Sequence, residues 1–151
     1  MARGPARRPW HGDGRGRARL MEAALARCPL FAGLDTDLLA RLMDVAETER
    51  CDAGCHPFVL GQAAEHVYVV MEGRVDLCLP LTIEGELQEV CIDTKEPGDA
   101  LGWSAFVRPY RFRLSARAAG MARLVTFPRR ALEEIFRKDP RAGHVFLGRV
   151  A

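Results

Sequence analysis

Hydrophobic residues change their spacing along this chain from helical to alternating and back again. Residues 19–28 place an apolar face on one side of a helix that Pro29 ends, with Leu20, Met21, Ala24, Leu25 and Cys28 on that face. Asp35 is a predicted N-cap for a second helix, whose apolar residues are Leu38, Leu39, Leu42, Met43 and Val45. Near the C-terminus, Pro128 and the pair Asp139-Pro140 each predict the start of a further helix.

Between these helical regions the pattern is typical of short strands separated by turns. Residues 66–81, HVYVVMEGRVDLCLPL, form two β-rich runs around Glu72-Gly73, which predicts a hairpin. The second run alternates, which predicts a buried face of Val75, Leu77 and Leu79 opposite Arg74, Asp76 and Cys78. EGE at 84–86 predicts another hairpin turn, and EPGD at 96–99 a further turn. The pattern favours a mainly β fold with flanking helices, a small barrel or jelly roll.

Composition and charge divide the chain into two parts. The 151 residues are 48% hydrophobic, which is enough for one domain with a core. Residues 1–19 are rich in Gly, Pro and Arg and are predicted to be a disordered leader, while residues 20–151 form the domain. A weak contact of the arginines with nucleic acid or an acidic surface is the alternative for the leader. Without an apolar segment of membrane or signal-peptide type, we expect a cytoplasmic protein with no membrane contact.

The five cysteines are expected to be free thiols, as in a reducing compartment. Cys51, Cys55 and His56 form a C-x3-C-H pattern that resembles part of a metal site, but only His66 offers a fourth ligand. We therefore expect no metal site. No nucleophile, histidine and acid occur at a catalytic spacing, and there is no phosphate-binding loop of the P-loop type, so we do not expect an enzyme.

The stretch PGDALGWSAFVRPYRFRLSARA, residues 97–118, combines residue types that bind anions. Gly102 permits close approach of the backbone, and WSAF at 103–106 is predicted to form a short helix. In a strand that runs from residue 111, one face carries Arg111, Arg113, Ser115 and Arg117, and the other Phe112, Leu114 and Ala116. Such a cationic and hydroxylic face fits a phosphate group. The alternative is a solvated basic strand whose arginines pair with the chain's own acids.

From about residue 25 to 151 the chain resembles the cyclic-nucleotide-binding domain of the catabolite-activator and FNR type. The resemblance rests on LARCPLFAGLDTDLLARLMDVAE, VYVVMEGRVDL with its Gly-x-Val, PGDALG, and SARAAGMARLVTFPRRALEEIFRKDP, in the family's order. It implies a double-stranded β-helix, or jelly roll, that encloses a cyclic nucleotide, cyclic AMP or cyclic GMP, under a helical lid, with no other cofactor required.

The cassette that binds the phosphate in this family departs from the family pattern here. Family members have Gly-Glu-Leu/Ile-Ala followed by Arg-x-Ala-Ser/Thr, in which Glu holds the ribose and Arg neutralises the cyclic phosphate. Trp103 stands at the Glu position and Phe112 at the Arg position, while Gly102, Ala105 and Ser115 match. The ligand-binding residues implied by the resemblance, with the arginines beside Phe112, are Gly102, Trp103, Ser104, Ala105, Arg111, Arg113 and Ser115.

Two interpretations of function remain open. The first is a regulatory module that senses a cyclic nucleotide or a related anion at this cassette. The second is a degenerate domain that acts through protein–protein contacts or dimerisation without a nucleotide. Only residues 140–151 follow Asp139, and no helix-turn-helix fits there, so direct DNA binding is not expected. An apolar stripe on that last helix would favour a homodimer or a partner protein.

Overall fold

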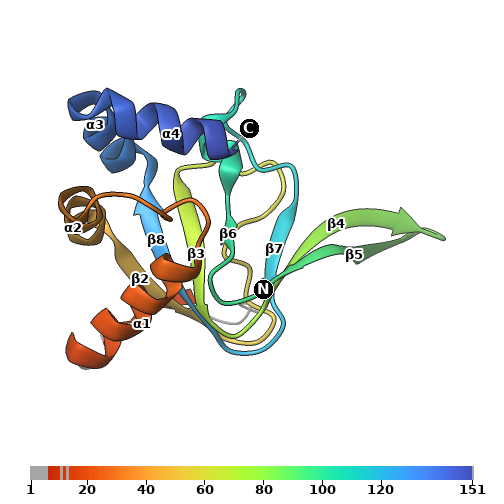
Figure 1. Ribbon diagram of the computed structural model, residues 1–151. Coiled ribbons are helices and arrows are strands. Elements are labelled where there is room, and N and C mark those ends of the chain that lie inside the picture. The colour runs from red at the N-terminus through yellow and green to blue at the C-terminus, as the bar shows by residue number, and fades with distance from the viewer. Residues whose placement is uncertain (1–6, 11, 13, 151) are drawn as a thin grey trace.

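The computed structural model describes residues 7–10, 12 and 14–150, with the backbone alone at Trp103, Leu147, Arg149 and Val150. Its elements follow the predicted order of helices, strands and helices (Figure 1). The helices are α1 (Gly14–Arg27), α2 (Thr36–Val45), the short 3-10 helix η1 (Trp103–Phe106), α3 (Arg129–Lys138) and α4 (Pro140–Val150). The strands are β1 (Arg7–Pro9), β2 (Glu47–Cys51), β3 (His66–Glu72), β4 (Val75–Ile83), β5 (Glu86–Lys95), β6 (Ala100–Leu101), β7 (Ser115–Ala118) and β8 (Ala122–Pro128).

The strands form two antiparallel sheets, which confirms the mainly β fold with flanking helices. The first sheet has the order β1-β2-β8-β3-β6 and the second the order β5-β4-β7. Figure 1 shows the outer part of the β4–β5 ribbon extending away from the body of the domain. The core gathers apolar side chains of the first sheet and of the helices, among them Leu42, Val69, Leu124, Phe127, Leu132 and Phe146.

Two local predictions are confirmed at the residues that make them. Asp35 caps α2, because its carboxylate accepts a hydrogen bond of 2.7 Å from the backbone N–H of Leu38. Glu84 and Gly85 form the tight turn between β4 and β5, with φ angles of 51° and 83°. Positive φ at both central residues is the geometry that a two-residue hairpin loop needs.

The N-terminal segment departs from the predicted leader of residues 1–19. Arg7–Pro9 form β1, which pairs with β2 so that Arg7 lies opposite Cys51. Helix α1 begins at Gly14, ahead of its first apolar residue. A strand at a sheet edge is held by backbone hydrogen bonds, which do not depend on its side chains. The Arg-rich composition of residues 7–9 therefore gave no sign that they form a strand. Residues 1–6, 11 and 13 of the predicted leader lie outside the described residues.

The hairpin predicted at Glu72-Gly73 is wrong, because β3 and β4 belong to different sheets. Gly73, at φ 84°, turns the chain from one sheet into the other, and a Cβ there would lie 2.9 Å from the Cα of Ala122 and collide with the backbone oxygen of Met121. A Gly turn between two strand-like runs has the same local signature whether the strands pair or separate. The glycine is therefore required by the close passage of the β7–β8 connection.

The alternation predicted for β4 holds at Val75 and fails at Cys78. Cys78 is buried, whereas Leu77 and Leu79 are half-buried. The pairing of β4 with β5 is irregular at this point, since Leu77 pairs with Asp93 but Cys78 pairs with Cys91. Beyond this bulge, strands β4 and β5 extend away from the core. Alternation of apolar and polar residues there no longer indicates which side chains are buried.

We expect Gly73→Ala to destabilise the fold more than Gly85→Ala. Both positions have left-handed φ, which costs a non-glycine residue about 1–2 kcal/mol. Gly85 has open space around its Cα, whereas Gly73 faces backbone atoms, and relieving that clash adds about 1–3 kcal/mol. Urea unfolding of the two variants measures the difference, and equal losses of unfolding free energy would contradict the close-packing explanation.

Candidate functional site

A pocket of about 180 Å³ lies between the predicted cassette and the second sheet. Five parts of the chain contribute to it: the loop after β2, then β4, β5, β6 and the cassette. Its lining residues are Phe58, Leu77, Lys95, Ala100, Leu101, Gly102, Ser104, Phe112, Arg113 and Leu114. The pocket thus lies at the place where the cassette pattern predicted a ligand site, with mostly apolar walls.

Two stacked phenyl rings form one wall of this pocket. The rings of Phe58 and Phe112 are nearly parallel, with an interplanar angle of 10° and 3.8 Å between centroids. Both side chains are buried. Phe112 stands where the family motif has arginine, so an apolar contact occupies the position of the expected cation.

The backbone of the cassette is held by the loop that follows Phe58. Phe112 donates a hydrogen bond of 3.0 Å to the carbonyl of Gln62 and accepts one of 2.8 Å from Gly61. The carbonyl of Tyr110 accepts one of 2.8 Å from Ala64. These bonds fix residues 110–112 against residues 61–64, and the chain then bends before β7 begins at Ser115.

The single cationic and hydroxylic face predicted from residue 111 onward is therefore wrong, because no continuous strand runs through it. The exposed Arg111 donates a hydrogen bond of 2.8 Å to the carbonyl of Gly61 and does not line the pocket. Arg113 does line it, and its side chain is exposed at the mouth. Ser115 is buried and accepts a hydrogen bond of 2.9 Å from the backbone N–H of Leu60. Arg117 is exposed on β7.

The first half of the cassette has the predicted form, a short helix after a glycine. Gly102 has φ 94° and lies against β3, where a Cβ would be 3.0 Å from the backbone oxygen of His66. Ser104 lines the pocket, and Ala105 is buried in the core. The side chain of Trp103, at the family's Glu position, lies outside the described part of the structure.

Two cationic residues, Lys95 and Arg113, line the pocket and have different surroundings. Lys95 is half-buried and forms an ion pair of 3.1 Å with Asp93, which lowers the pKa of that carboxyl group. Among the described residues, none forms an ion pair or a hydrogen bond with the guanidinium of Arg113. Arg113 is thus the guanidinium best placed to meet a ligand.

Three lining residues, Phe58, Leu77 and Lys95, lie outside the stretch 97–118 in which the sequence predicted a site. Sequence reasoning also did not assign ligand contacts to four lining residues inside that stretch, Ala100, Leu101, Phe112 and Leu114. Phe58 lies in a short apolar run between proline and glycine, a pattern that predicts burial but no particular neighbour. Leu77 was expected to be a core residue of a strand. Lys95 directly precedes the EPGD turn, and only the pairing of β4 with β5 brings it to the pocket.

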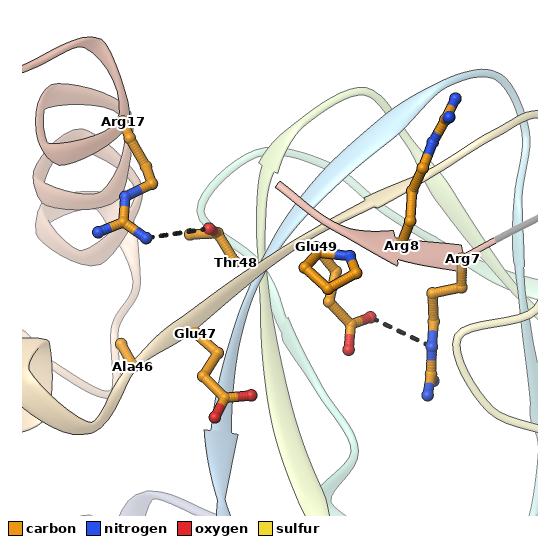
Figure 2. Close-up of a pocket in the computed structure, with 8 residues that line it drawn as sticks. Arg7, Arg8, Arg17, Ala46, Glu47, Thr48 and Glu49 are labelled. Carbon is orange, nitrogen blue, oxygen red and sulfur yellow. Dashed lines mark hydrogen bonds and ion pairs between the residues drawn. The ribbon is translucent and has the colours of Figure 1, made fainter. Parts of the chain in front are cut away.

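A larger cleft of about 540 Å³ lies between α1 and the strands β1 and β2, and Figure 2 shows its mixed charge. Arg7 forms an ion pair of 3.4 Å with Glu49, and Arg17 donates a hydrogen bond of 3.5 Å to Thr48. Burial raises the pKa of Glu49, and the nearby Arg7 partly offsets this. Glu47 lines the same cleft. Because acidic residues face these arginines, the cleft does not form a cationic surface.

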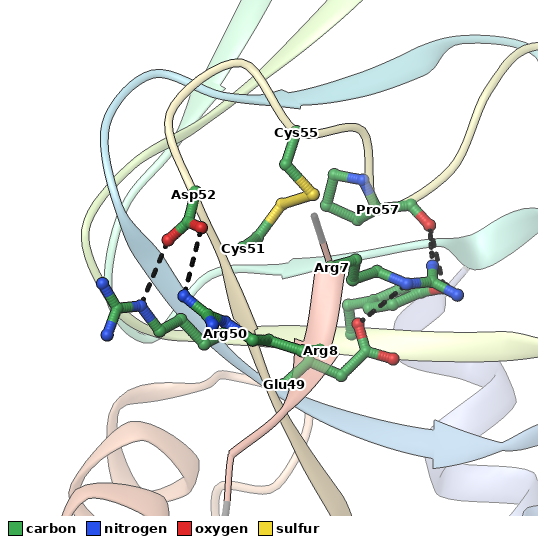
Figure 3. The surroundings of a disulfide bond; sticks show 9 residues. Arg7, Arg8, Glu49, Arg50, Cys51, Asp52, Cys55 and Pro57 are labelled. Atoms are coloured by element: carbon green, nitrogen blue, oxygen red, sulfur yellow. Dashed lines mark hydrogen bonds and ion pairs between the residues drawn. A yellow bond between two sulfur atoms is a disulfide. The ribbon is translucent and has the colours of Figure 1, made fainter. Parts of the chain in front are cut away.

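Cys51 and Cys55 form a disulfide bond, which corrects the expectation of free thiols for this pair (Figure 3). Their Cα atoms are 5.6 Å apart, a separation typical of disulfides. Cys28, Cys78 and Cys91 are free, and burial raises the pKa of the Cys28 thiol. The Nε2 atom of His56 lies 2.7 Å from a carboxylate oxygen of Glu89, within hydrogen-bond distance. Within the described ranges, no group of three or more His, Cys, Asp or Glu residues could hold a metal ion.

Comparison with known families and structures agrees with this geometry. The family model for the cyclic nucleotide-binding domain matches residues 48–139, more than half of the chain. The chain belongs to the cyclic nucleotide-binding domain family, a regulatory and not a catalytic class of domain. No curated protein matches the chain by sequence. In the described residues, none of the helices has the length and apolar character needed to cross a membrane.

Solved structures share the fold at low sequence identity. The N-terminal domain of a transcriptional regulator from Streptomyces coelicolor is 24% identical with a TM-score of 0.71, and the match covers 84% of this chain and 86% of that one. A cyclic nucleotide-binding domain from Methylobacillus flagellatus is 15% identical with a TM-score of 0.74, over 95% and 80% of the two chains. These neighbours confirm the jelly-roll fold.

The regulatory domain of Toxoplasma gondii PKA, solved with cAMP, shares the same fold over part of its length. It is 22% identical with a TM-score of 0.68, and the match covers 83% of this chain and 46% of that one. The present chain therefore spans less than half the length of the Toxoplasma chain that it matches.

We expect Ser115→Ala to lower stability, whereas Ser104→Ala leaves it nearly unchanged. The first substitution removes the acceptor for the N–H of Leu60 inside the fold, a loss of about 1 kcal/mol. Ser104 lies at the pocket, and its loss should stay within about 0.5 kcal/mol. Urea unfolding distinguishes the two. A Ser115 variant as stable as the parent would contradict the structural role of this hydroxyl group.

Proposed function

We propose that this chain is a ligand-sensing regulatory module that binds a cyclic nucleotide or a related small anion in the pocket beside its cassette. The observation that carries the proposal is the position of Arg113, at the mouth of a pocket in the family's cassette region and free of an internal partner among the described residues. In this arrangement the ligand's ring meets the wall of Phe58 and Phe112, and its anionic group meets Arg113, Lys95 and the hydroxyl of Ser104.

The aromatic wall and the cationic side chains each contribute to the expected binding free energy. An aromatic pair adds about 0.5–1.5 kcal/mol beyond the area that it buries. A hydrogen bond to a charged group adds about 1.5–3 kcal/mol when it is shielded from water, and less at an exposed side chain such as Arg113. Binding of a cyclic nucleotide by this chain is therefore expected to be weaker than binding through a buried arginine.

We propose that the module acts in the cytoplasm, needs no cofactor, catalyses no reaction and passes its signal through α4 to a second copy or a partner protein. Helix α4 packs on the core through Phe146, whose ring lies 4.8 Å from that of Phe136, while Val145 is 43% exposed on the same helix. Of the predicted ligand residues, Gly102, Ser104 and Arg113 line the pocket and form the proposed site.

One observation favours a second candidate function, a degenerate domain that acts through protein contacts alone. The buried ring of Phe112 replaces the cation that the family uses for the cyclic phosphate. This alternative predicts no effect of a nucleotide on stability, together with concentration-dependent self-association or a protein partner.

Thermal unfolding with cyclic AMP, cyclic GMP and AMP tests the two functions. A ligand at one hundred times its Kd adds about 2.7 kcal/mol, which raises the Tm by several degrees in a domain of this size. We expect at least one cyclic nucleotide at millimolar concentration to raise the Tm, and Arg113→Ala to reduce this shift. Arg111→Ala is the matched control and should retain it, because Arg111 bonds Gly61 outside the pocket.

Two results would reject this model. Equal loss of the shift in both arginine variants would mean that net charge, and not the pocket geometry, governs binding. No shift with any of the three nucleotides, combined with sedimentation that depends on protein concentration, would support the degenerate domain.

A further inference from the structure

The disulfide between Cys51 and Cys55 lies in the interior of the domain. Cys51 is the last residue of β2, and the two cysteines are 0% and 2% exposed. A tight turn separates them, in which the N–H of Cys55 donates a hydrogen bond of 2.9 Å to the carbonyl of Asp52. The bond therefore closes a very short loop at the end of a strand.

This short loop connects the two sheets. Cys51 pairs with Ala122 of β8 in the first sheet. Cys55 accepts a hydrogen bond of 2.8 Å from Ala118 of β7, in the second sheet, and Gly54 donates one of 2.8 Å to the same residue. The disulfide thus fixes the end of β2, in one sheet, to a segment that hydrogen-bonds with the other sheet.

The same segment continues directly into the wall of the ligand pocket. Phe58 accepts a hydrogen bond of 3.0 Å from Ala116 of β7 and stacks on Phe112. Further along, Gly61 and Gln62 hold the backbone of Phe112. Only His56 and Pro57 separate Cys55 from Phe58, so a constraint at Cys55 is transmitted to the ring that lines the pocket.

Strand β1 lies next to β2 at the disulfide (Figure 3). Arg7 lies opposite Cys51 in the sheet, and Arg8 lies opposite Arg50. The Arg7 guanidinium donates to the carbonyl of Pro57, and Arg8 forms an ion pair of 3.4 Å with Asp52. Strand β1 is only three residues long and its ion pairs are partly exposed, and Trp10 after it donates a hydrogen bond of 3.0 Å to the carbonyl of Thr48. Access of a reductant to the disulfide requires local opening of this segment.

We propose that Cys51 and Cys55 form a reversible redox site that sets the rigidity of the pocket wall. The reaction is exchange with a small dithiol. One thiolate of the dithiol attacks a sulfur of the disulfide and breaks the bond, and its second thiol then closes the reductant's own disulfide. The protein gains two electrons and two protons as two thiols. The link to ligand binding rests on the function proposed above, whereas the redox site itself does not.

The reduced protein should keep its fold and lose local order. Buried thiols pack as small apolar groups, so the core around Cys51 and Cys55 remains filled. Reduction removes the covalent bond that restricts the conformation of residues 52–54. Hydrogen bonds alone then hold the segment that carries Phe58 in position. Reduction should lower the Tm by about 5 °C or more, as expected for loss of a short disulfide loop.

The first experiment counts thiols in the full chain, unfolded without reductant and treated with an alkylating reagent for mass spectrometry. Protein equilibrated with oxidised dithiothreitol should take up three labels, at Cys28, Cys78 and Cys91. Protein equilibrated with reduced dithiothreitol should take up five, one at each cysteine of the sequence. Five labels in both samples would overturn the proposal.

The second experiment compares amide hydrogen exchange of the two forms. We expect exchange to be at least about tenfold faster in the reduced form at residues 54–62, and unchanged in β3 and β8. Cys91→Ser, at an exposed free cysteine, is the matched control and should respond to reduction as the parent does. Cys55→Ser should show the reduced pattern under both conditions. If that variant does not fold, the two forms of the parent protein still give the comparison.

The outcomes separate the redox site from ligand binding. Equal exchange at residues 54–62 in the two forms would overturn the proposed effect on the pocket wall. Faster exchange without any Tm shift by cyclic nucleotides would support the redox site and reject the ligand-sensing function. If reduction changes both the exchange and the nucleotide-dependent Tm shift, the redox site regulates the ligand pocket.

Discussion

The stack of Phe58 on Phe112 is the contact on which the architecture of the site depends. The two rings lie 3.8 Å apart at 10°, and they come from segments about fifty residues apart in the chain. Phe58 is attached to the second sheet through β7, and Phe112 belongs to the cassette. Their contact therefore sets the distance between the cassette and the sheet, and with it the width of the pocket.

Around this contact, backbone hydrogen bonds rather than charges shape the cassette. Residues 61–64 pair with residues 110–112, and Arg111 adds a bond from its side chain to Gly61. The loop after β2 is thus as much a part of the site as the cassette is. Because the Cys51–Cys55 disulfide precedes this loop by only a few residues, the chemistry of the cysteines and the geometry of the pocket are physically linked.

Local signals predicted those parts of the fold whose cause is local. The cap at Asp35, the turn at Glu84-Gly85 and the short helix at 103–106 each depend on neighbours in sequence, and each is present. The pairing of β3 and β4 was wrong because Gly73 serves a contact with Ala122, far along the chain. The continuous arginine face failed for the same reason, since residues 61–64 bind the cassette before β7 starts. The spacing of hydrophobic residues along the sequence does not indicate contacts with residues that are distant in the chain.

The position of the cations determines which ligands this pocket can favour. Coulomb interactions weaken in proportion to the dielectric constant, so an arginine at the water-exposed mouth contributes less than one enclosed by protein. Arg113 is exposed, whereas Phe58, Leu101 and Phe112 are buried. Burial of apolar surface by the ligand must therefore supply the larger share of affinity, at about 25 cal/mol per Å². A ligand with a broad ring and one anionic group fits an apolar inner wall and an exposed cation better than a compact, highly charged phosphate does. Its ring buries apolar surface against the inner wall, while its charge stays near water.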